Sequence, residues 1–117
     1  MNEIVTGNTF EDGKDYKQWV VGYFVDKSLG LRRDPRVEVR WSVHSAGEAR
    51  PEWAAGTSAT TMTILISGKF ANSFREVGEV LMERQGDYIL YPPGADHTWR
   101  AIEDSVVLTI RWPSEPL

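Results

Sequence analysis

The most regular pattern in the chain is a strict alternation of apolar and polar residues over positions 37–44. The apolar positions are Val37, Val39, Trp41 and Val43, and the polar positions are Glu38, Arg40, Ser42 and His44. Successive side chains of a β-strand point to opposite faces, so a period of two predicts a half-buried strand. We expect the apolar face to meet the core and the polar face to be solvated. The alternative is that the polar face lines the mouth of a barrel.

Several other short segments have the composition of strands and are separated by Gly- and Pro-containing turns. No segment carries a helical period over ten or more residues. Short strands at short spacing predict an all-β sandwich or barrel. The expected strands are residues 19–25, 57–66, 69–74, 79–83, 88–91, 98–101 and 106–112, with 69–74 and 79–83 pairing around Gly78 and a loop over 27–35.

Length and composition limit the classes of function. A chain of 117 residues is one domain, which we divide into a polar N-terminal arm over 1–15 and a β-barrel over 16–117. The net charge of −4 argues against a nucleic-acid partner, because phosphate binding needs clustered Lys and Arg. There is no cysteine, which excludes disulfides and thiolate chemistry. No signal pattern or long apolar run occurs, so we expect a cytoplasmic protein that does not engage a membrane.

Residues 86–97 read GDYILYPPGADH, a short strand followed by a Pro-Pro-Gly turn and a histidine. The spacing of Gly86, Pro92, Gly94 and His97 resembles the second signature motif of the cupin superfamily. The glycines permit the positive φ angles of tight turns, and Pro92 ends the strand rigidly. The motif's final asparagine is replaced by Ala101. This resemblance implies a single-domain, antiparallel jelly-roll barrel with His97 on its inner wall.

The first cupin motif, which carries most of the metal ligands, is only partly present. Gly47 and Gly68 take the places of its two ends, with a span one residue longer than the motif, and its glutamate position falls on Thr61. Its two histidine positions fall within 53–57, a segment that reads WAAGT. One imidazole cannot replace the three protein ligands that a catalytic metal typically needs. We therefore expect a cupin-like protein without a metal cofactor.

Six residues are candidates for a ligand site. His97 is the candidate acid or base, since the pKa of histidine lies near neutrality. Trp99 follows on the same strand face, where it is either a pocket wall or barrel core. Trp53 either fills the space of the lost ligands or packs on the rim. The remaining candidates are Thr61 and Thr63, whose hydroxyls suit a polar neutral ligand, and His44, a second imidazole if its strand face points inward.

The sequence supports three kinds of function. The first is a metal-independent pocket for a small molecule of unknown identity. The second is an isomerase, cyclase or lyase that uses His97 as acid and base, or a metal enzyme with His97, His44 and Glu48 or Glu52 as relocated ligands. The third is a partner-binding module with a filled barrel. The cupin resemblance and the open edges of such a barrel predict a homodimer.

Overall fold

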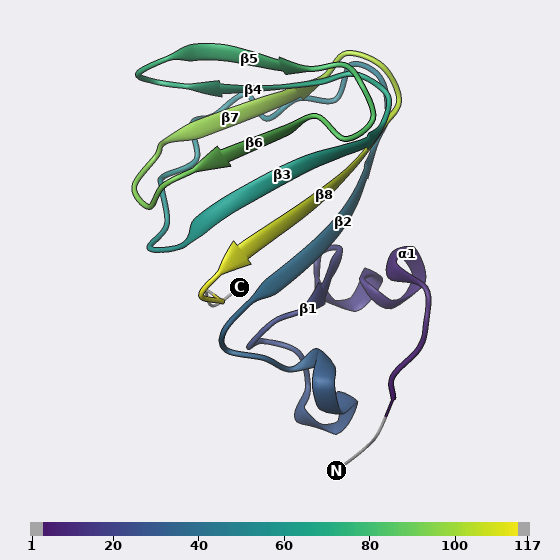
Figure 1. Cartoon of the computed structure of the whole chain (residues 1–117). Coiled ribbons are helices and arrows are strands. Elements are labelled where there is room, and N and C mark those ends of the chain that lie inside the picture. Colours follow the sequence, from purple (N-terminus) through teal and green to yellow (C-terminus); the bar gives the residue numbers. More distant parts are fainter. Residues whose placement is uncertain (1–3, 115–117) are drawn as a thin grey trace.

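The computed structural model describes residues 4–114, and within this range eight strands form two antiparallel sheets (Figure 1). The five-stranded sheet has the order β1-β2-β8-β3-β6, and the three-stranded sheet has the order β5-β4-β7. The strands are β1 (Trp19–Val21), β2 (Glu38–His44), β3 (Thr60–Ser67), β4 (Phe70–Phe74), β5 (Gly78–Met82), β6 (Tyr88–Tyr91), β7 (His97–Ala101) and β8 (Ser105–Trp112).

The segment between β2 and β3 runs along the free side of β7. Isolated bridges pair Ala49 with Arg100 and Ala54 with His97. The Ala54 amide donates to the His97 carbonyl at 2.7 Å, and the His97 amide donates back at 3.0 Å. This pairing places the region of the first cupin motif directly beside the strand that begins with His97.

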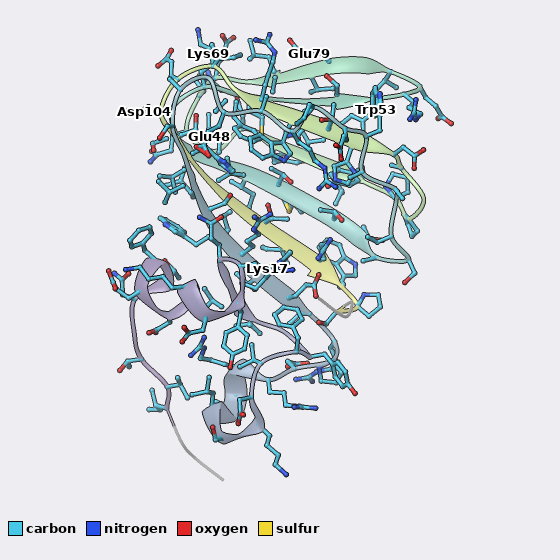
Figure 2. All side chains as sticks on the ribbon, turned by 180° about the vertical axis from the view of Figure 1, so that it is seen from behind. Lys17, Glu48, Trp53, Lys69, Glu79 and Asp104 are labelled. Carbon is cyan, nitrogen blue, oxygen red and sulfur yellow. The ribbon has the colours of Figure 1, made fainter. Side chains whose placement is uncertain are left out.

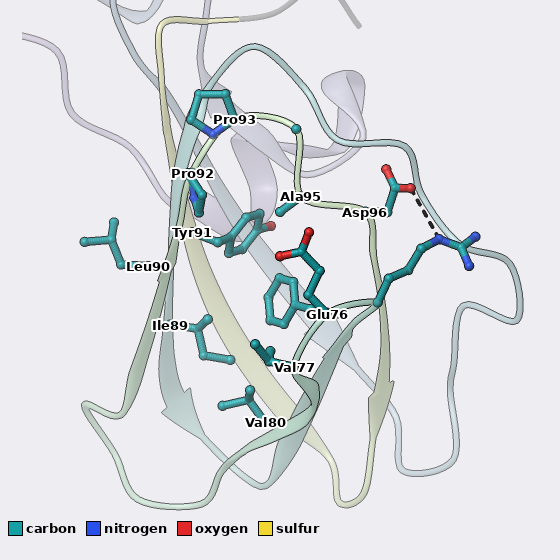
Figure 3. Close-up of a pocket in the computed structure, with 13 residues that line it drawn as sticks. Glu76, Val77, Val80, Ile89, Leu90, Tyr91, Pro92, Pro93, Ala95 and Asp96 are labelled. Carbon is teal, nitrogen blue, oxygen red and sulfur yellow. Dashed lines mark hydrogen bonds and ion pairs between the residues drawn. The ribbon is translucent and has the colours of Figure 1, made fainter.

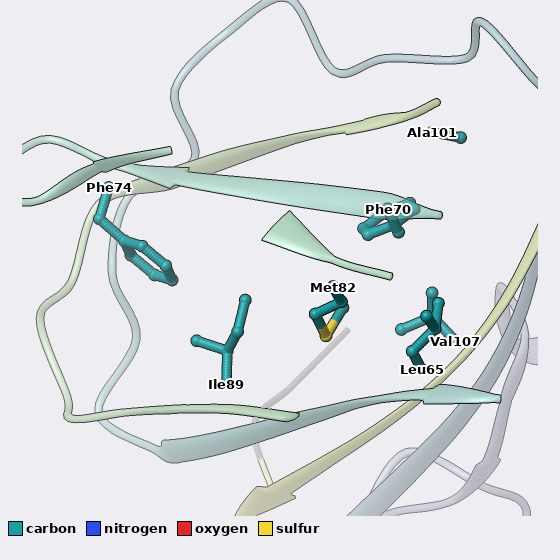
Figure 4. Close-up of a cluster of buried hydrophobic side chains, with 7 residues drawn as sticks. All are labelled: Leu65, Phe70, Phe74, Met82, Ile89, Ala101 and Val107. Atoms are coloured by element: carbon teal, nitrogen blue, oxygen red, sulfur yellow. The ribbon is translucent and has the colours of Figure 1, made fainter. Parts of the chain in front are cut away.

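The apolar core lies between the two sheets (Figure 4). Every member is at most 8% exposed. This core and the all-antiparallel pairing confirm the predicted all-β jelly-roll fold. The core residues are Leu65, Phe70, Phe74, Met82, Ile89, Ala101 and Val107.

The face of β2 that points inward is the polar one, so the expected solvated face is wrong and the barrel-mouth alternative is correct. Glu38, Ser42 and His44 are buried, whereas Val43 is 42% exposed. The polar groups are tolerated because they are paired inside. Glu38 accepts hydrogen bonds from Arg111 Nε and from Ser114 Oγ, and Ser42 Oγ donates to the Val107 carbonyl at 3.2 Å.

Most predicted strands occur with boundaries shifted by one to three residues. The expected strand over 19–25 is the main exception, since β1 ends at Val21 and the chain turns at Gly22. The amide of Gly22 bonds the Arg32 carbonyl, which ties the turn to the segment expected as loop. That segment contains the 3₁₀ helix η2 (Lys27–Arg32).

The turns of the second motif have the expected backbone. Gly86 and Gly94 have φ angles of 92° and 84°, in the region that favours glycine. The Gly94 amide donates to the Thr57 carbonyl at 2.9 Å. The motif turn is thereby joined to the segment that precedes β3.

The N-terminal segment adds short helices beside the edge of the five-stranded sheet. They are α1 (Thr9–Asp12) and the 3₁₀ helix η1 (Lys14–Tyr16). Arg32 Nη2 donates to the Asp12 carbonyl at 3.0 Å, and the Trp41 amide donates to the Gln18 carbonyl at 3.1 Å. The first three residues of the predicted arm and the last three of the predicted barrel lie outside the described residues. Over positions 4–114, no helix is long and apolar enough to cross a membrane.

Candidate functional site

A cavity of about 300 Å³ opens between the two sheets, beside the apolar core. Its walls come from β1 to β4 and β6 to β8, together with the segment before β3. The lining combines aromatic rings with arginines, histidines, hydroxyls and one amide. Four of the six predicted site residues line it, namely His44, Thr63, His97 and Trp99.

His97 begins β7 and is held in one orientation by its own loop. Its Nδ1 lies 3.1 Å from the Ala95 carbonyl oxygen. A carbonyl oxygen can only accept, so Nδ1 carries the proton and Nε2 of the neutral ring keeps a free lone pair. Burial lowers the pKa of His97 below its ordinary value of 6.5, and the nearby Arg50 and Arg111 guanidiniums lower it further. The ring is therefore a neutral imidazole near pH 7, with its basic nitrogen available.

His44 ends β2 and packs within a group of rings. Its ring centroid lies 4.5 Å from that of Trp99 and 5.0 Å from that of Phe70. Burial lowers the pKa of His44, Glu48 raises it, and Arg40 lowers it. The inward position that sequence reasoning held as the alternative is thus the observed one. Trp99 is both cavity wall and part of this aromatic cluster.

Tyr91, at the end of β6, connects the hydroxyl-bearing strand to His97. Its ring centroid lies 5.3 Å from that of His97. Burial raises the pKa of the phenol, and hydrogen bonding to Thr61 and Thr63 opposes that shift. Thr61 is 2% exposed and does not line the cavity. Of the two predicted hydroxyls, Thr63 therefore borders the cavity, whereas Thr61 contributes by its hydrogen bond to Tyr91.

Trp53 lies away from the cavity, in the loop at the rim of the molecule (Figure 2). Its side chain is 40% exposed, and the Arg75 guanidinium lies 4.5 Å from its ring centroid. This is the rim position that the sequence left open as the alternative. The neighbouring Ala54, Ala55 and Thr57 line the cavity in its place.

The side chains beside the cavity do not fit a metal ion of the kind that cupins hold. Among residues 4–114, no three His, Cys, Asp or Glu side chains come together as a group that could hold one. Glu48, one partner considered for a relocated centre, accepts a hydrogen bond from the Ser45 amide. The segment 53–57, within which the cupin resemblance places the two histidines, reads WAAGT and contains no histidine or carboxylate.

Three arginines in the lining are the feature that sequence reasoning missed. Arg40 comes from β2, Arg50 from the segment beside β7, and Arg111 from β8. The guanidiniums of Arg40 and Arg111 lie 5.7 and 4.4 Å from the Trp19 ring centroid. The only sequence signal was Arg40 in the alternating strand, which we interpreted as solvated. Nothing in the local sequence of Arg50 or Arg111 marks them as facing inward.

A second and wider groove lies at the seam between the sheets, near the motif turn (Figure 3). It has a volume of about 540 Å³ and is lined mainly by apolar side chains, including Val77, Val80, Leu90 and Pro92. The Arg75–Asp96 ion pair closes one side at 3.3 Å. Tyr91 borders both the groove and the smaller cavity, but none of the six predicted site residues lines the groove. The smaller cavity is therefore the candidate site.

No protein-family model and no curated protein matches the sequence, but many solved structures share its fold. A cupin superfamily protein from Desulfitobacterium hafniense superposes with a TM-score of 0.62 at 16% identity, over 70% of this chain and 72% of that one. KdgF from Halomonas gives 0.61 at 18%, over 69% and 73%. The DMSP lyase DddQ from Ruegeria pomeroyi gives 0.58 at 15%, over 70% of this chain and 40% of that one.

The two antiparallel sheets enclosing one cavity define a jelly-roll β protein. Its neighbours, repeatedly named as cupins, identify that jelly roll as the cupin fold, as the Gly86–His97 motif predicted.

Proposed function

We propose that the chain binds a small molecule in the cavity between its sheets and that it does so without a metal ion. The observation that carries this proposal is the cavity itself, whose walls bring together His97, His44 and Trp99. Ligand pockets are concave and place a few converging polar groups to orient the ligand, and here such groups face an aromatic wall. Small residues at the expected metal-ligand positions leave this space open for the ligand.

The cavity also argues against the filled-barrel module. A barrel that served only as a partner-binding scaffold would gain stability by packing its interior with apolar side chains. Here the interior is divided between a packed core and a polar space of about 300 Å³. His44 is buried, and Arg40, Arg111 and His97 are half-buried. Taking such polar groups partly out of water around a space is costly, so the arrangement favours a ligand.

An enzyme is the second candidate, and one observation favours it. The Ala95 carbonyl holds the Nδ1 proton of His97, so Nε2 is free to take a proton from a ligand. A DMSP lyase is among the proteins with this fold, so such a fold supports lyase chemistry. An isomerase, cyclase or lyase with His97 as general base is consistent with this geometry. The ligand pocket is the more direct conclusion, since it needs no second catalytic group.

The experiment combines metal analysis with a ligand screen on untagged protein. We expect sub-stoichiometric Fe, Mn, Ni and Zn, and we expect several compounds of a metabolite library to raise the melting temperature. We predict that His97→Gln stays folded, because an amide replaces one hydrogen bond, and weakens binding of each hit at least tenfold, or about 1.4 kcal/mol. Trp53→Phe, outside the cavity, is the matched control and should leave affinity unchanged.

Two results would contradict this proposal. One stoichiometric transition metal per chain would overturn metal-independent binding. Unchanged affinity in His97→Gln would show that His97 is only structural. For the enzyme alternative, turnover of a hit should follow a pH profile with one limb near neutrality that His97→Gln lacks.

A further inference from the structure

We propose that the ligand of this cavity is a small organic acid whose carboxylate binds at Arg40 and Asn72. This inference rests on the proposed binding function and adds the chemical class of the ligand. It replaces the polar neutral ligand that the strand hydroxyls suggested. Three independent features of the cavity carry it: its charge, its unpartnered donors and its apolar wall.

The lining of the cavity is cationic. Arg40, Arg50 and Arg111 border it, and among residues 4–114 no aspartate or glutamate does. The chain as a whole carries a net charge of −4, so this positive interior is a local feature. Burial lowers the pKa of Arg40, and repulsion from Arg111 and Arg50, which border the same cavity, lowers it further.

The protein itself neutralises only part of this charge. Arg111 forms an ion pair with the fully buried Glu38. Within the described range, neither Arg40 nor Arg50 forms a salt bridge. The only hydrogen bond from the Arg40 guanidinium within that range is a long one of 3.4 Å from Nη2 to the Gln18 side chain. Arg50 is exposed, whereas Arg40 is half-buried and its Nε is buried. A partly buried cation without a counter-ion is unfavourable, and an anionic ligand supplies that counter-ion.

Two donors in the same cavity have no partner. Across residues 4–114, the buried side-chain atoms without a hydrogen bond are Arg40 Nε and Asn72 Nδ2. Both residues line the cavity, on facing sheets, and Asn72 is only 5% exposed. Buried polar groups in native proteins are nearly always satisfied, so unpartnered donors beside a cavity indicate an acceptor that the ligand provides. A carboxylate has two acceptor oxygens and suits a guanidinium and an amide together.

The remaining wall is apolar and fits an organic body. The rings of Phe70 and Trp99 stack with centroids 5.4 Å apart, and Val107 borders the same space. A wall of this kind contributes favourably only if the ligand has apolar surface to bury against it. Inorganic anions lack such surface, so the combination specifies an organic acid.

The test compares matched acids and amides by isothermal titration calorimetry. The probes are benzoate and hexanoate, their amides benzamide and hexanamide, and phenyl phosphate. We expect at least one carboxylate to bind saturably and its amide to bind at least tenfold more weakly. Equal affinity for acid and amide would overturn the inference while leaving the proposed binding function intact. Tighter binding of phenyl phosphate than of benzoate would overturn the carboxylate assignment.

Variants of the cavity test whether the carboxylate binds at Arg40 and Asn72. Arg40→Gln and Asn72→Leu should each weaken binding of the carboxylate at least tenfold while leaving amide binding unchanged. Arg36→Gln is the control, because it removes the same charge from an exposed ion pair with Asp34. Carboxylate affinity that is the same in Arg40→Gln and Arg36→Gln would overturn the site. The acid–amide comparison on the unmodified protein gives a result even if a cavity variant fails to fold.

Discussion

At the scale of the residue, the ionisable groups inside the barrel govern both its chemistry and its stability. Glu38 is a fully buried carboxylate, and it is tolerated because Arg111 and Ser114 satisfy its oxygens. Removing one partner of such a pair leaves a buried charge and typically costs about 3–5 kcal/mol. The two histidines are different, since burial lowers the pKa of each and keeps its ring neutral near pH 7.

The histidines predict a loss of stability on mild acidification. The pKa values of His44 and His97 are both lowered in the folded state from an ordinary value of 6.5, mainly by burial. Below that pH the unfolded chain binds protons first, so the free energy of unfolding falls as pH decreases. We expect the urea midpoint to decrease between pH 7.5 and pH 5.5, where the carboxylates remain ionised.

The double variant His44→Gln/His97→Gln should show a flatter dependence over the same pH range. The charged groups facing the two rings are Glu48 and Arg40 for His44, and Arg50, Arg111 and Asp96 for His97. A dependence as steep in the double variant as in the unmodified protein would show that other groups titrate in this window.

At the scale of the element, the turn after β6 positions the site. Gly94 has a φ of 84°, and a Cβ added there would meet no atom within 4 Å. Gly56 is the opposite case, because a Cβ there would lie 2.2 Å from the Gly94 carbonyl carbon. The motif turn and the segment before β3 thus touch backbone to backbone, and this contact brings Ala54 and Thr57 to the cavity next to His97.

This contact predicts different costs for two alanine substitutions. Gly94→Ala should lower the free energy of unfolding by about 1 kcal/mol, through backbone strain alone. Gly56→Ala should cost more, about 2–3 kcal/mol, since backbone must move to admit the methyl group. Urea denaturation measures both. An unchanged stability for Gly94→Ala would count against the role of this turn as the cupin motif.

At the scale of the whole molecule, the five-stranded sheet leaves an apolar face uncovered. Because the polar face of β2 points inward, the apolar faces of its neighbours align outside through the strand register. Val43, Tyr88 and Leu90 on this face are 42%, 61% and 54% exposed. Its members are Val39, Trp41, Val43, Met62, Ile64, Tyr88, Leu90, Val106, Leu108, Ile110 and Trp112, none of which is charged.

We propose that a second copy of the chain covers this face, so the expected homodimer stays a prediction with a specified interface. The strands β2, β8, β3 and β6 have 7, 8, 8 and 4 residues, which at about 3.3 Å per residue and about 4.8 Å between strands give roughly 430 Å² per copy. Two copies then bury about 860 Å², which is in the range of weak interfaces. We expect light scattering at micromolar concentration to give twice the 13.3 kDa of one chain.

Val43→Glu combined with Leu90→Glu should convert that dimer to a monomer, because each copy would bury carboxylates against the other. Leu31→Glu is the control, as Leu31 is 63% exposed in η2, outside this face. A monomeric unmodified protein, or a dimer that survives the double substitution, would rule out this interface.

Local sequence patterns were enough to predict the class of fold and the position of its main turn. Alternation and strand composition depend on neighbouring residues and predicted the strands. The resemblance of the Gly86–His97 spacing to a cupin motif added the positive φ at Gly94 and the inward position of His97. The same locality explains why the strand boundaries were approximate, as at β1, where the turn at Gly22 depends on contacts with η2.

The inward face of β2 and the set of residues that share the cavity depend on the three-dimensional arrangement of the strands. A period of two defines two faces but not which one meets the interior. The inside is polar here because Arg40, Arg50 and Arg111, far apart in sequence, meet around one space that the core does not fill. No local sequence pattern predicts that these three arginines line one cavity, because their proximity follows from the order of the strands in the sheets. The cationic character of the site therefore belongs to the fold and could not be predicted from any single segment.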